Sequence, residues 1–526
     1  MRQSMNRREM LKWGAAGLAG AGLYKGLEMA GLRPGRAAPS EAGEGVKGIH
    51  ESLGKYIYLT PQKLGGGTHA VDLDTHKTLA WISYWNYGDT CPISHHLAAF
   101  PPENGNPYDG FEFVNSTQGG ENVLIYGIPT RIKQYGLLDR YGQGNHIYRV
   151  GYSGRTGQME LLEDISETTG IGLGVHTTIY PDGTGFACAD GQKDVAAFFT
   201  RARGAREKTE VQMAYRADWV PNAPNLGDAW LKGGTVRLTK LAKAKETGEY
   251  DYEGTRGNKI NWEMAPMAEL LVERGQIPGD SPRTLTGLDN VVHDTRGRFS
   301  VMTLRMCGGV IVLDRKNWEP VCFLYAPEDS AESNLPIKKV SGNPDTWEIK
   351  LKAVGNPVHE AGFNPSGTHF VIMNNLRANN VAVFNVDDDD PRKWKRETFV
   401  RDETWKGEYP SPFHVCFSVD GSKCFLSVLY PKPGKSDVVV VDAKTWKVIK
   451  KFPRVGVDCQ TMHITYDGKY VLQIFSGFQR MESGAFVFRQ DTLDPVGYMP
   501  NFGGHHDCVV VPSKVDELKW SRCCTV

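Results

Sequence analysis

A turn motif that recurs along the chain constrains the fold more than any other feature of the sequence. In each copy an apolar stretch leads into a turn that contains glycine, and a β-rich run follows. Glycine readily adopts the left-handed backbone that tight hairpin turns require, so each copy predicts a β-hairpin. The turn glycines are Gly110, Gly183, Gly297, Gly367, Gly421 and Gly468.

A second hairpin signal follows most of these turns. An alternating strand, a short polar turn and another strand occupy 309–324, 437–452 and 485–499. Two hairpins per unit make a four-stranded blade, and blades in series form a propeller. Helical periodicity is scarce, which disfavours an all-helical fold. The predicted fold class is all-β, a seven-bladed β-propeller with a central metal-lined channel and partly helical insertions. A β-sandwich array is the alternative.

The first residues predict an export signal. Adjacent Arg7 and Arg8 precede an apolar stretch over 13–23, which is shorter than the roughly 20 residues that cross a bilayer. This pattern is typical of the twin-arginine pathway and predicts a periplasmic protein with no membrane span in its mature form. We therefore expect residues 1–42 to be signal peptide and linker, and 43–526 to be one propeller domain with an insertion at about 205–280.

Histidines recur at one position of the predicted repeat. The innermost strand of each blade runs into the turn glycine and starts near the axis, so side chains at the strand starts should converge there. His176 and His414 lie seven residues before their glycines, whereas Asp289, His359 and Gln460 lie eight before theirs. Adjacent pairs head the first and last frames. They are His95 with His96 and His505 with His506.

This set of residues predicts a metal centre. At least five of the 14 histidines share the frame, together with one aspartate and no cysteine. That number exceeds what one tetrahedral zinc ion takes, and calcium prefers oxygen ligands. Several ions bound by imidazole favour copper, with zinc or iron open. The remaining histidines are expected to be ordinary core or surface residues, with His463 undecided; they are His50, His69, His76, His146, His293 and His369.

Several local motifs resemble one known group. The chain is similar to the periplasmic copper propellers related to the catalytic propeller of nitrous oxide reductase, and within them to the thiocyanate dehydrogenases. The motifs that carry this likeness are Gly88-Asp89-Thr90 with His95-His96, Gly174-Val175-His176-Thr177-Thr178, Asn356-Pro357-Val358-His359-Glu360, Ser411-Pro412-Phe413-His414 and Gly503-Gly504-His505-His506-Asp507.

The resemblance implies a copper centre, with three ions expected, and a reaction. Thiocyanate and water would give cyanate, elemental sulfur and two electrons. Lys63 would hold the anion, Glu263 or Asp289 would accept a proton, and Gln460 would orient water or substrate. Asp294 is the alternate for Asp289, and His96 and His506 are the alternates within their pairs. The implied copper ligands are His95, His176, Asp289, His359, His414 and His505.

The expected partners follow from charge and chain length. Lysine plus arginine equals aspartate plus glutamate, at 61 each, which argues against nucleic acid as a partner. The cupredoxin electron-entry domain of nitrous oxide reductase is missing, so electrons should leave through an external acceptor such as a cytochrome c. A homodimer stays open. The alternatives are another small-molecule copper oxidoreductase, similar to nitrous oxide reductase, and a non-enzymatic copper-binding propeller.

Overall fold

The computed structural model describes residues 48–49, 51–62, 66–84, 93–100, 110–118, 145–191, 194–203, 207–222, 233–242, 286–328, 330–352, 358–374, 380–402, 405, 411–430, 436–456, 459, 461–465, 467–477, 482–500 and 509–512. Within these ranges the chain is almost wholly β-structure. The short helical elements there are α6 (Ile165–Thr169), η4 (Arg305–Cys307) and η5 (Pro391–Lys393).

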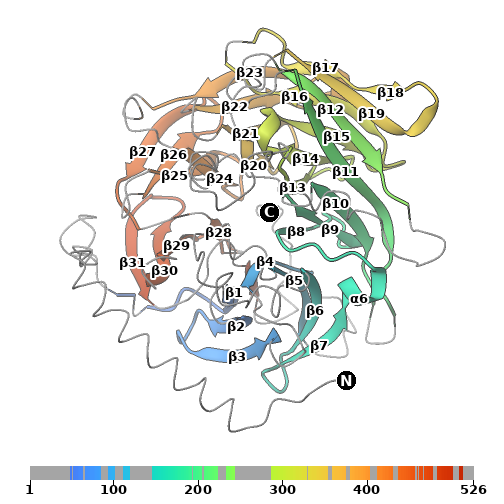
Figure 1. Ribbon diagram of the computed structural model, residues 1–526. Helices are drawn as coiled ribbons and strands as arrows, with labels where there is room; N and C mark the ends of the chain where they lie inside the picture. The colour runs from blue at the N-terminus through green and yellow to red at the C-terminus, as the bar shows by residue number, and fades with distance from the viewer. Residues whose placement is uncertain are drawn as a thin grey trace, which may run out of the picture.

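The described strands form seven sheets arranged around a common centre (Figure 1). Five of the sheets have four strands. One combines both ends of the described chain, in the order β3 (Thr78–Ser83), β2 (Gly67–Asp72), β1 (Tyr56–Gln62) and β32 (Val509–Pro512). The next comprises β4 (Ile93–Ala99), β5 (Phe111–Gln118), β6 (His146–Ser153) and β7 (Gln158–Asp164).

The other three four-stranded sheets follow one another in the second half of the chain. The first contains β20 (Val358–Phe363), β21 (His369–Asn374), β22 (Asn380–Asn385) and β23 (Lys395–Val400). The second contains β24 (Ser411–Phe417), β25 (Lys423–Leu429), β26 (Ser436–Asp442) and β27 (Lys447–Phe452). The third contains β28 (Met462–Ile464), β29 (Tyr470–Gly477), β30 (Glu482–Arg489) and β31 (Pro495–Pro500).

Two sheets are larger than the predicted four strands. The five-stranded sheet runs β13 (Leu288–His293), β14 (Phe299–Leu304), β15 (Gly309–Asp314), β16 (Pro320–Tyr325) and β17 (Asn334–Pro336). The seven-stranded sheet runs β18 (Lys338–Val340), β19 (Asn343–Leu351), β12 (Gly234–Lys240), β11 (Val211–Pro221), β10 (Val195–Thr200), β9 (Gly185–Asp190) and β8 (His176–Ile179).

The region predicted as a partly helical insertion differs from that expectation in its described part. Residues 211–221 and 234–240 are the strands β11 and β12, which pair with each other and extend the sheet outward from β10. The outer strand β12 then pairs with β19, more than a hundred residues further along the chain. Three parts of the predicted insertion, 205–206, 223–232 and 243–280, lie outside the described residues, as does the predicted signal segment over 1–42.

The innermost strands surround the centre of the molecule. Figure 1 shows β4, β8, β13, β20, β24 and β28 around this centre. Each of them contacts the innermost strand of the next sheet, and β32 contacts both β28 and β4. Buried apolar side chains fill the space between neighbouring sheets. Val371 and Val383, for example, pack with Leu426 and Val439 of the following sheet. The architecture is therefore all-β and propeller-like, with its innermost strands facing the centre.

Five of the six predicted turns are confirmed by their backbone, whereas the sixth glycine, Gly110, does not have a positive φ. Five of the turn glycines have φ between 67° and 75°. In each of these turns the glycine N–H donates to the carbonyl three residues earlier. The glycines are Gly183, Gly297, Gly367, Gly421 and Gly468. The second hairpins are also confirmed, as β15–β16, β26–β27 and β30–β31.

Two further points concern the class of protein. Cys188 in β9 and Cys424 in β25 are wholly buried, so both pack as small core residues. Over the part of the chain that the structure describes, no helix has both the length and the apolar character needed to cross a membrane.

Candidate metal centre

The structure describes about half of the predicted site. The side chains of His95, His96, His176, Asp289 and His414 are described, and all are at most 5% exposed. His359 lies on the innermost strand β20, as predicted, but its side chain is outside the described part. The other predicted site residues fall outside the described ranges and stay predictions; they are Lys63, Glu263, Gln460, His505 and His506.

Three histidines from two neighbouring sheets lie together. His95 and His96 belong to β4, and His176 is the first residue of β8. The ring centroids of His96 and His176 are 4.7 Å apart, and those of His95 and His176 are 5.7 Å apart. Residues 80 positions apart in the sequence thus share one buried cluster.

The innermost strands are irregular where the candidate residues occur. In β4 the pairing register shifts between Ser94 and His96, and in β13 it shifts between Leu288 and Val291. The same irregularity occurs in β20 and β24, beside His359 and His414. A β-bulge re-aims side chains and is common beside functional sites. It also breaks the strict alternation of faces, so consecutive side chains are no longer bound to opposite faces.

Two of the imidazoles are held by the backbone of the next innermost strand. Nδ1 of His95 lies 3.2 Å from the carbonyl oxygen of Val175, and Nδ1 of His176 lies 2.7 Å from that of Asp289. A carbonyl only accepts, so each Nδ1 carries the proton and each Nε2 keeps its lone pair. Metal-binding histidines are typically fixed in this way. Nδ1 of His96 faces both the N–H and the carbonyl of Thr177, which leaves its tautomer undefined.

Nδ1 of His414 accepts a hydrogen bond, whereas Nδ1 of His95 and of His176 donates one. The Met462 N–H donates to its Nδ1 over 3.2 Å, so the proton of a neutral ring sits on Nε2. That Nε2 lies 3.4 Å from Oε2 of Glu360, and both side chains are at most 2% exposed. Binding a metal through Nε2 would therefore require His414 to release that proton. His414 fits a ligand role less directly than His95 and His176 do.

Asp289 joins the cluster through two of its groups. Its carbonyl accepts from His176, and its Oδ1 lies 3.9 Å from the same imidazole nitrogen. Its Oδ2 forms an ion pair with Nη2 of Arg305 over 3.0 Å. The alternate residue Asp294 lies instead in the turn, where it binds Nε of Arg298 and the turn N–H of Arg296. The structure thus brings Asp289, rather than Asp294, to the histidines.

The surroundings keep His176 neutral. Burial lowers the pKa of His176 from its ordinary value to about 4. Asp289 opposes this effect, while His96 and Arg305 add to it. A neutral imidazole offers a lone pair, which is the form that a metal ion binds.

Sequence reasoning missed two charged residues that contact predicted ligands. Glu360 lies seven residues before Gly367, the same offset that identified His176 and His414. The adjacent His359 was chosen as the ligand of this frame instead. Arg305 lies beyond the end of β14 and reaches Asp289 only through the folded sheet. Counting from the glycines at both offsets would have found Glu360, whereas no local signal points to Arg305.

Several histidines outside the frame have structural roles, as expected. His293 lies between the hydroxyls of Thr178 and Ser300. His146 pairs with Asp164, and His369 pairs with Glu397. The undecided His463 is 3% exposed on the innermost strand β28.

The donor set fits copper in its chemistry. It consists of neutral imidazole nitrogens and a carboxylate, with no cysteine sulfur among the described axial side chains. Among the side chains that the structure describes, no three His, Cys, Asp or Glu residues are close enough to form a metal-binding group. The arrangement nevertheless offers two Nε2 lone pairs in one buried site, beside a carboxylate that an arginine holds.

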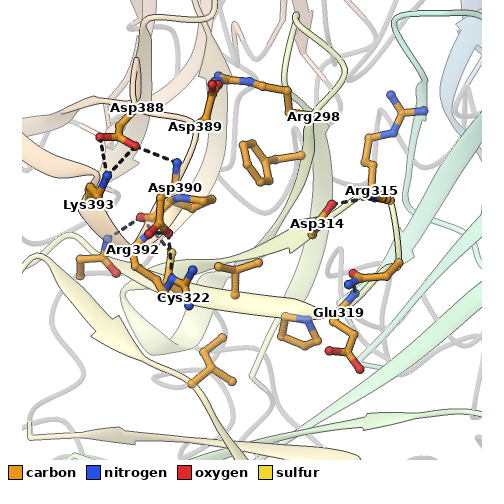
Figure 2. Close-up of a pocket in the computed structure, with 18 of the residues that line it drawn as sticks. Arg298, Asp314, Arg315, Glu319, Cys322, Asp388, Asp389, Asp390, Arg392 and Lys393 are labelled. Carbon is orange, nitrogen blue, oxygen red and sulfur yellow. Dashed lines mark hydrogen bonds and ion pairs between the residues drawn. The ribbon is translucent and has the colours of Figure 1, made fainter.

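A hollow of about 1420 Å³ is lined by none of the axial candidate residues. It is open and strongly charged, and ion pairs line it (Figure 2). We call it the outer groove. Its charged lining residues are Asp182, Arg298, Asp314, Arg315, Lys316, Glu319, Asp388, Asp389, Asp390, Arg392 and Lys393.

Comparison with known proteins gives only distant likenesses. No family profile and no curated protein matches the sequence. The solved structures that resemble the chain include the Pseudomonas aeruginosa periplasmic gluconolactonase PpgL, at 11% identity and a TM-score of 0.46, over 87% of this chain and 99% of that one.

Two other similar structures are a dehydrogenase and a β-propeller domain. One is the dihydro-heme d1 dehydrogenase NirN, at 10% identity and a TM-score of 0.41, over 92% of this chain and 84% of that one. The other is the β-propeller domain of Myceliophteria thermophila Cps50 (Swd1), at 11% identity and a TM-score of 0.40, over 81% and 93%. Likenesses at this level assign no family, so the chain is placed by its own sheets and axial residues.

Proposed function

We propose that this chain is a closed seven-bladed propeller that binds copper at its axis and oxidises thiocyanate. With water, thiocyanate would give cyanate, elemental sulfur, two protons and two electrons. The electrons would pass to an external acceptor, with a cytochrome c as the expected partner. Export by the twin-arginine pathway would place the enzyme in the periplasm.

The observation that carries this proposal is the buried meeting of His95, His96 and His176. Their rings come from two sheets, and the Nδ1–H groups of His95 and His176 donate to backbone carbonyls. An imidazole whose Nδ1–H is fixed by a backbone carbonyl is oriented to bind a metal ion through Nε2, as metal-binding histidines typically do.

The chain's own residues have distinct roles in this proposal. His95, His176 and Asp289 would hold copper, together with His359, His414 and His505 from the remaining frames. His96 and His506 are alternates. Copper would supply a redox centre that accepts electrons from a small soft anion. Lys63 would hold that anion, and Glu263 or Gln460 would position the attacking water and its proton.

Asp289 is better suited to ligate than to act as a base. Its Oδ2 is bound by Arg305, and its Oδ1 lies on the side of His176. This leaves Glu263 as the proton acceptor of choice.

The proposal is tested by elemental analysis paired with a thiocyanate-dependent dye-reduction assay on the mature protein. We expect more than one copper per chain and dye reduction that requires both copper and thiocyanate. Turnover of nitrous oxide instead of thiocyanate would favour the other copper oxidoreductases. Copper without turnover would indicate a copper-binding protein, and absence of copper would overturn the proposal.

A further inference from the structure

Asp289 is held on two sides by residues that no part of the sequence pattern identifies. On one side Nη2 of Arg305 lies 3.0 Å from Oδ2, and the two side chains are 9% and 8% exposed. On the other side the carboxylate lies against the backbone at Gly191. Both neighbours come from outside β13, the strand that carries Asp289.

Local backbone geometry delivers Arg305 to this position. β14 pairs antiparallel with β13, with Leu304 opposite Leu288. Arg305 follows directly, and its N–H donates to the carbonyl of Gly287 over 2.8 Å. The element η4 then ends at Gly308, which has a φ of 68°. The guanidinium is thus anchored beside the start of the strand that it serves.

Gly191 leaves space that the carboxylate uses. A Cβ added at Gly191 would lie 2.8 Å from Oδ1 of Asp289 and 3.3 Å from its Cβ. Real Cβ atoms essentially never come closer than 3.0 Å to another heavy atom, so a side chain here must displace Asp289. The backbone of Gly191 lies outside the left-handed region, so alanine would meet a steric limit rather than a conformational one.

The contact network ends at His176. Arg305 fixes the carboxylate of Asp289, and the carbonyl of Asp289 fixes Nδ1 of His176. Second-layer partners of this kind set the direction of metal ligands, and their loss typically weakens metal binding about 10- to 100-fold.

A second Arg–Asp pair on the same two strands provides an internal comparison. Arg298 binds Asp294 through Nε at the opposite end of β13 and β14, beside the glycine turn. That pair also secures the turn, since Asp294 accepts from the N–H of Arg296. It is a structural pair, and it lies away from His176.

We propose that Arg305 and Gly191 are positioning residues of the axial metal centre, which orient Asp289 and through it His176. The inference rests on the proposed function in one respect, that Asp289 and His176 bind copper. Arg305 acts by an ion pair, and Gly191 acts by leaving room. The two residues therefore make separate predictions.

The test measures copper affinity by competition with a chelator, using the full chain. R305M should bind copper about 10- to 100-fold more weakly than the unmodified protein, and R305K should restore part of the loss because it keeps the charge. G191A should weaken copper binding in the same range without removing any charge. The electron paramagnetic resonance spectrum of bound copper should change in both variants.

Two matched variants control for stability. R298M removes the structural Arg–Asp pair at the other end of the same hairpin, and G151A adds a Cβ in β6, where the nearest atom is a methyl of Leu162 at 3.3 Å. Both should keep the copper affinity and spectrum of the unmodified protein, whatever their melting temperatures. If R305M and G191A matched these controls in copper affinity, the inference would be wrong.

The copper measurements would give a different result if the proposed function itself were wrong. In that case the unmodified protein itself would bind no copper, and all variants would be alike. Copper binding by the unmodified protein, with equal binding by R305M and G191A, would overturn only the positioning role. Reduced binding in R305M, partly recovered in R305K, would support it.

Discussion

The outer groove and the axial centre both contain charged side chains, but these side chains are mostly exposed in the groove and buried at the centre. In the outer groove the consecutive residues Asp388, Asp389 and Asp390 each form an ion pair with a basic side chain. Figure 2 shows the pairs of Asp388 with Lys393 and of Asp390 with Arg392. Most of these groups are well exposed, with the Asp389 side chain at 89%. At the axial centre the charged groups are buried, and carboxylates lie beside imidazoles.

The exposure of its charges identifies the outer groove as solvated surface, whereas the burial of its charges marks the axial centre as a candidate site. Exposed ion pairs contribute about 0–1 kcal/mol each, because water already screens the charges. A buried charge costs several kcal/mol unless it is paired, so a fold retains one only where something compensates. Arg305 is that compensation for Asp289. The size of the outer groove therefore says less about function than the burial of the smaller axial cluster does.

The largest effect should come from breaking the axial pair. Asp289→Ala leaves Arg305 buried without its carboxylate, which should lower the free energy of unfolding by about 3–5 kcal/mol. Denaturant unfolding of the metal-free protein measures the change. A decrease in the free energy of unfolding below about 1 kcal/mol would mean that the axial ion pair contributes no more than the exposed pairs of the outer groove, and the distinction between the two regions would be wrong.

The next effect is a dependence on pH. The folded protein holds the pKa of His176 at about 4, whereas an unfolded histidine titrates near about 6.5. Below about pH 6.5 the unfolded chain takes up a proton that the folded chain refuses, so stability should fall by up to about 1.4 kcal/mol per pH unit down to about pH 4.

The substitution His176→Gln should remove this part of the slope in metal-free protein, and the surface variant His369→Gln should keep it. Unfolding titrations at a series of pH values measure both. An unchanged slope in the His176 variant would show that this ring is protonated as easily in the folded chain as in the unfolded one.

A smaller effect is expected at the turn end of the strands. Gly421 has a φ of 71°, and a Cβ there would make only ordinary contact with Pro365 at 3.6 Å. Gly421→Ala should therefore cost about 1–2 kcal/mol, from the backbone alone. Copper content should not change. Thermal melts and metal analysis check the two statements, and loss of copper would mean that the turns and the axial centre are coupled.

The smallest effect should occur in the outer groove. Asp389→Asn weakens an ion pair with Arg298 in which the aspartate is almost fully exposed. The free energy of unfolding should fall by less than about 1 kcal/mol, and less at high salt. Denaturant unfolding at two salt concentrations is the measurement. A loss as large as that of Asp289→Ala would contradict the distinction between the two regions.

Local signals in the sequence were enough to predict the innermost strands. A turn with a positive φ favours glycine, so the turns at Gly183 and Gly421 could be recognised from the sequence. Counting back from these two glycines identified His176 and His414. The prediction of uniform four-stranded blades was too simple, because β12 pairs with β19 across more than a hundred residues. Such non-local pairing leaves no periodic trace in either segment.

The residues that support the site were the hardest to predict. Arg305 and Gly191 meet Asp289 only after β9, β13 and β14 have packed. Neither carries a motif, and each looks like an ordinary loop residue in the sequence. The sequence also could not predict which ring nitrogen of His414 carries the proton, since this depends on the N–H of Met462 from the next sheet. The residue types of a site can be predicted from sequence more readily than the contacts that orient them.

The central claim, that histidines from separate sheets bind copper together at the axis, is tested most directly by anomalous diffraction at the copper absorption edge. Crystals of the copper-loaded protein should show peaks about 2.0–2.1 Å from Nε2 of His95 and of His176, the usual distance between a metal ion and imidazole nitrogen. Copper found only beside surface histidines such as His146 or His369, with none at the axis, would contradict the account.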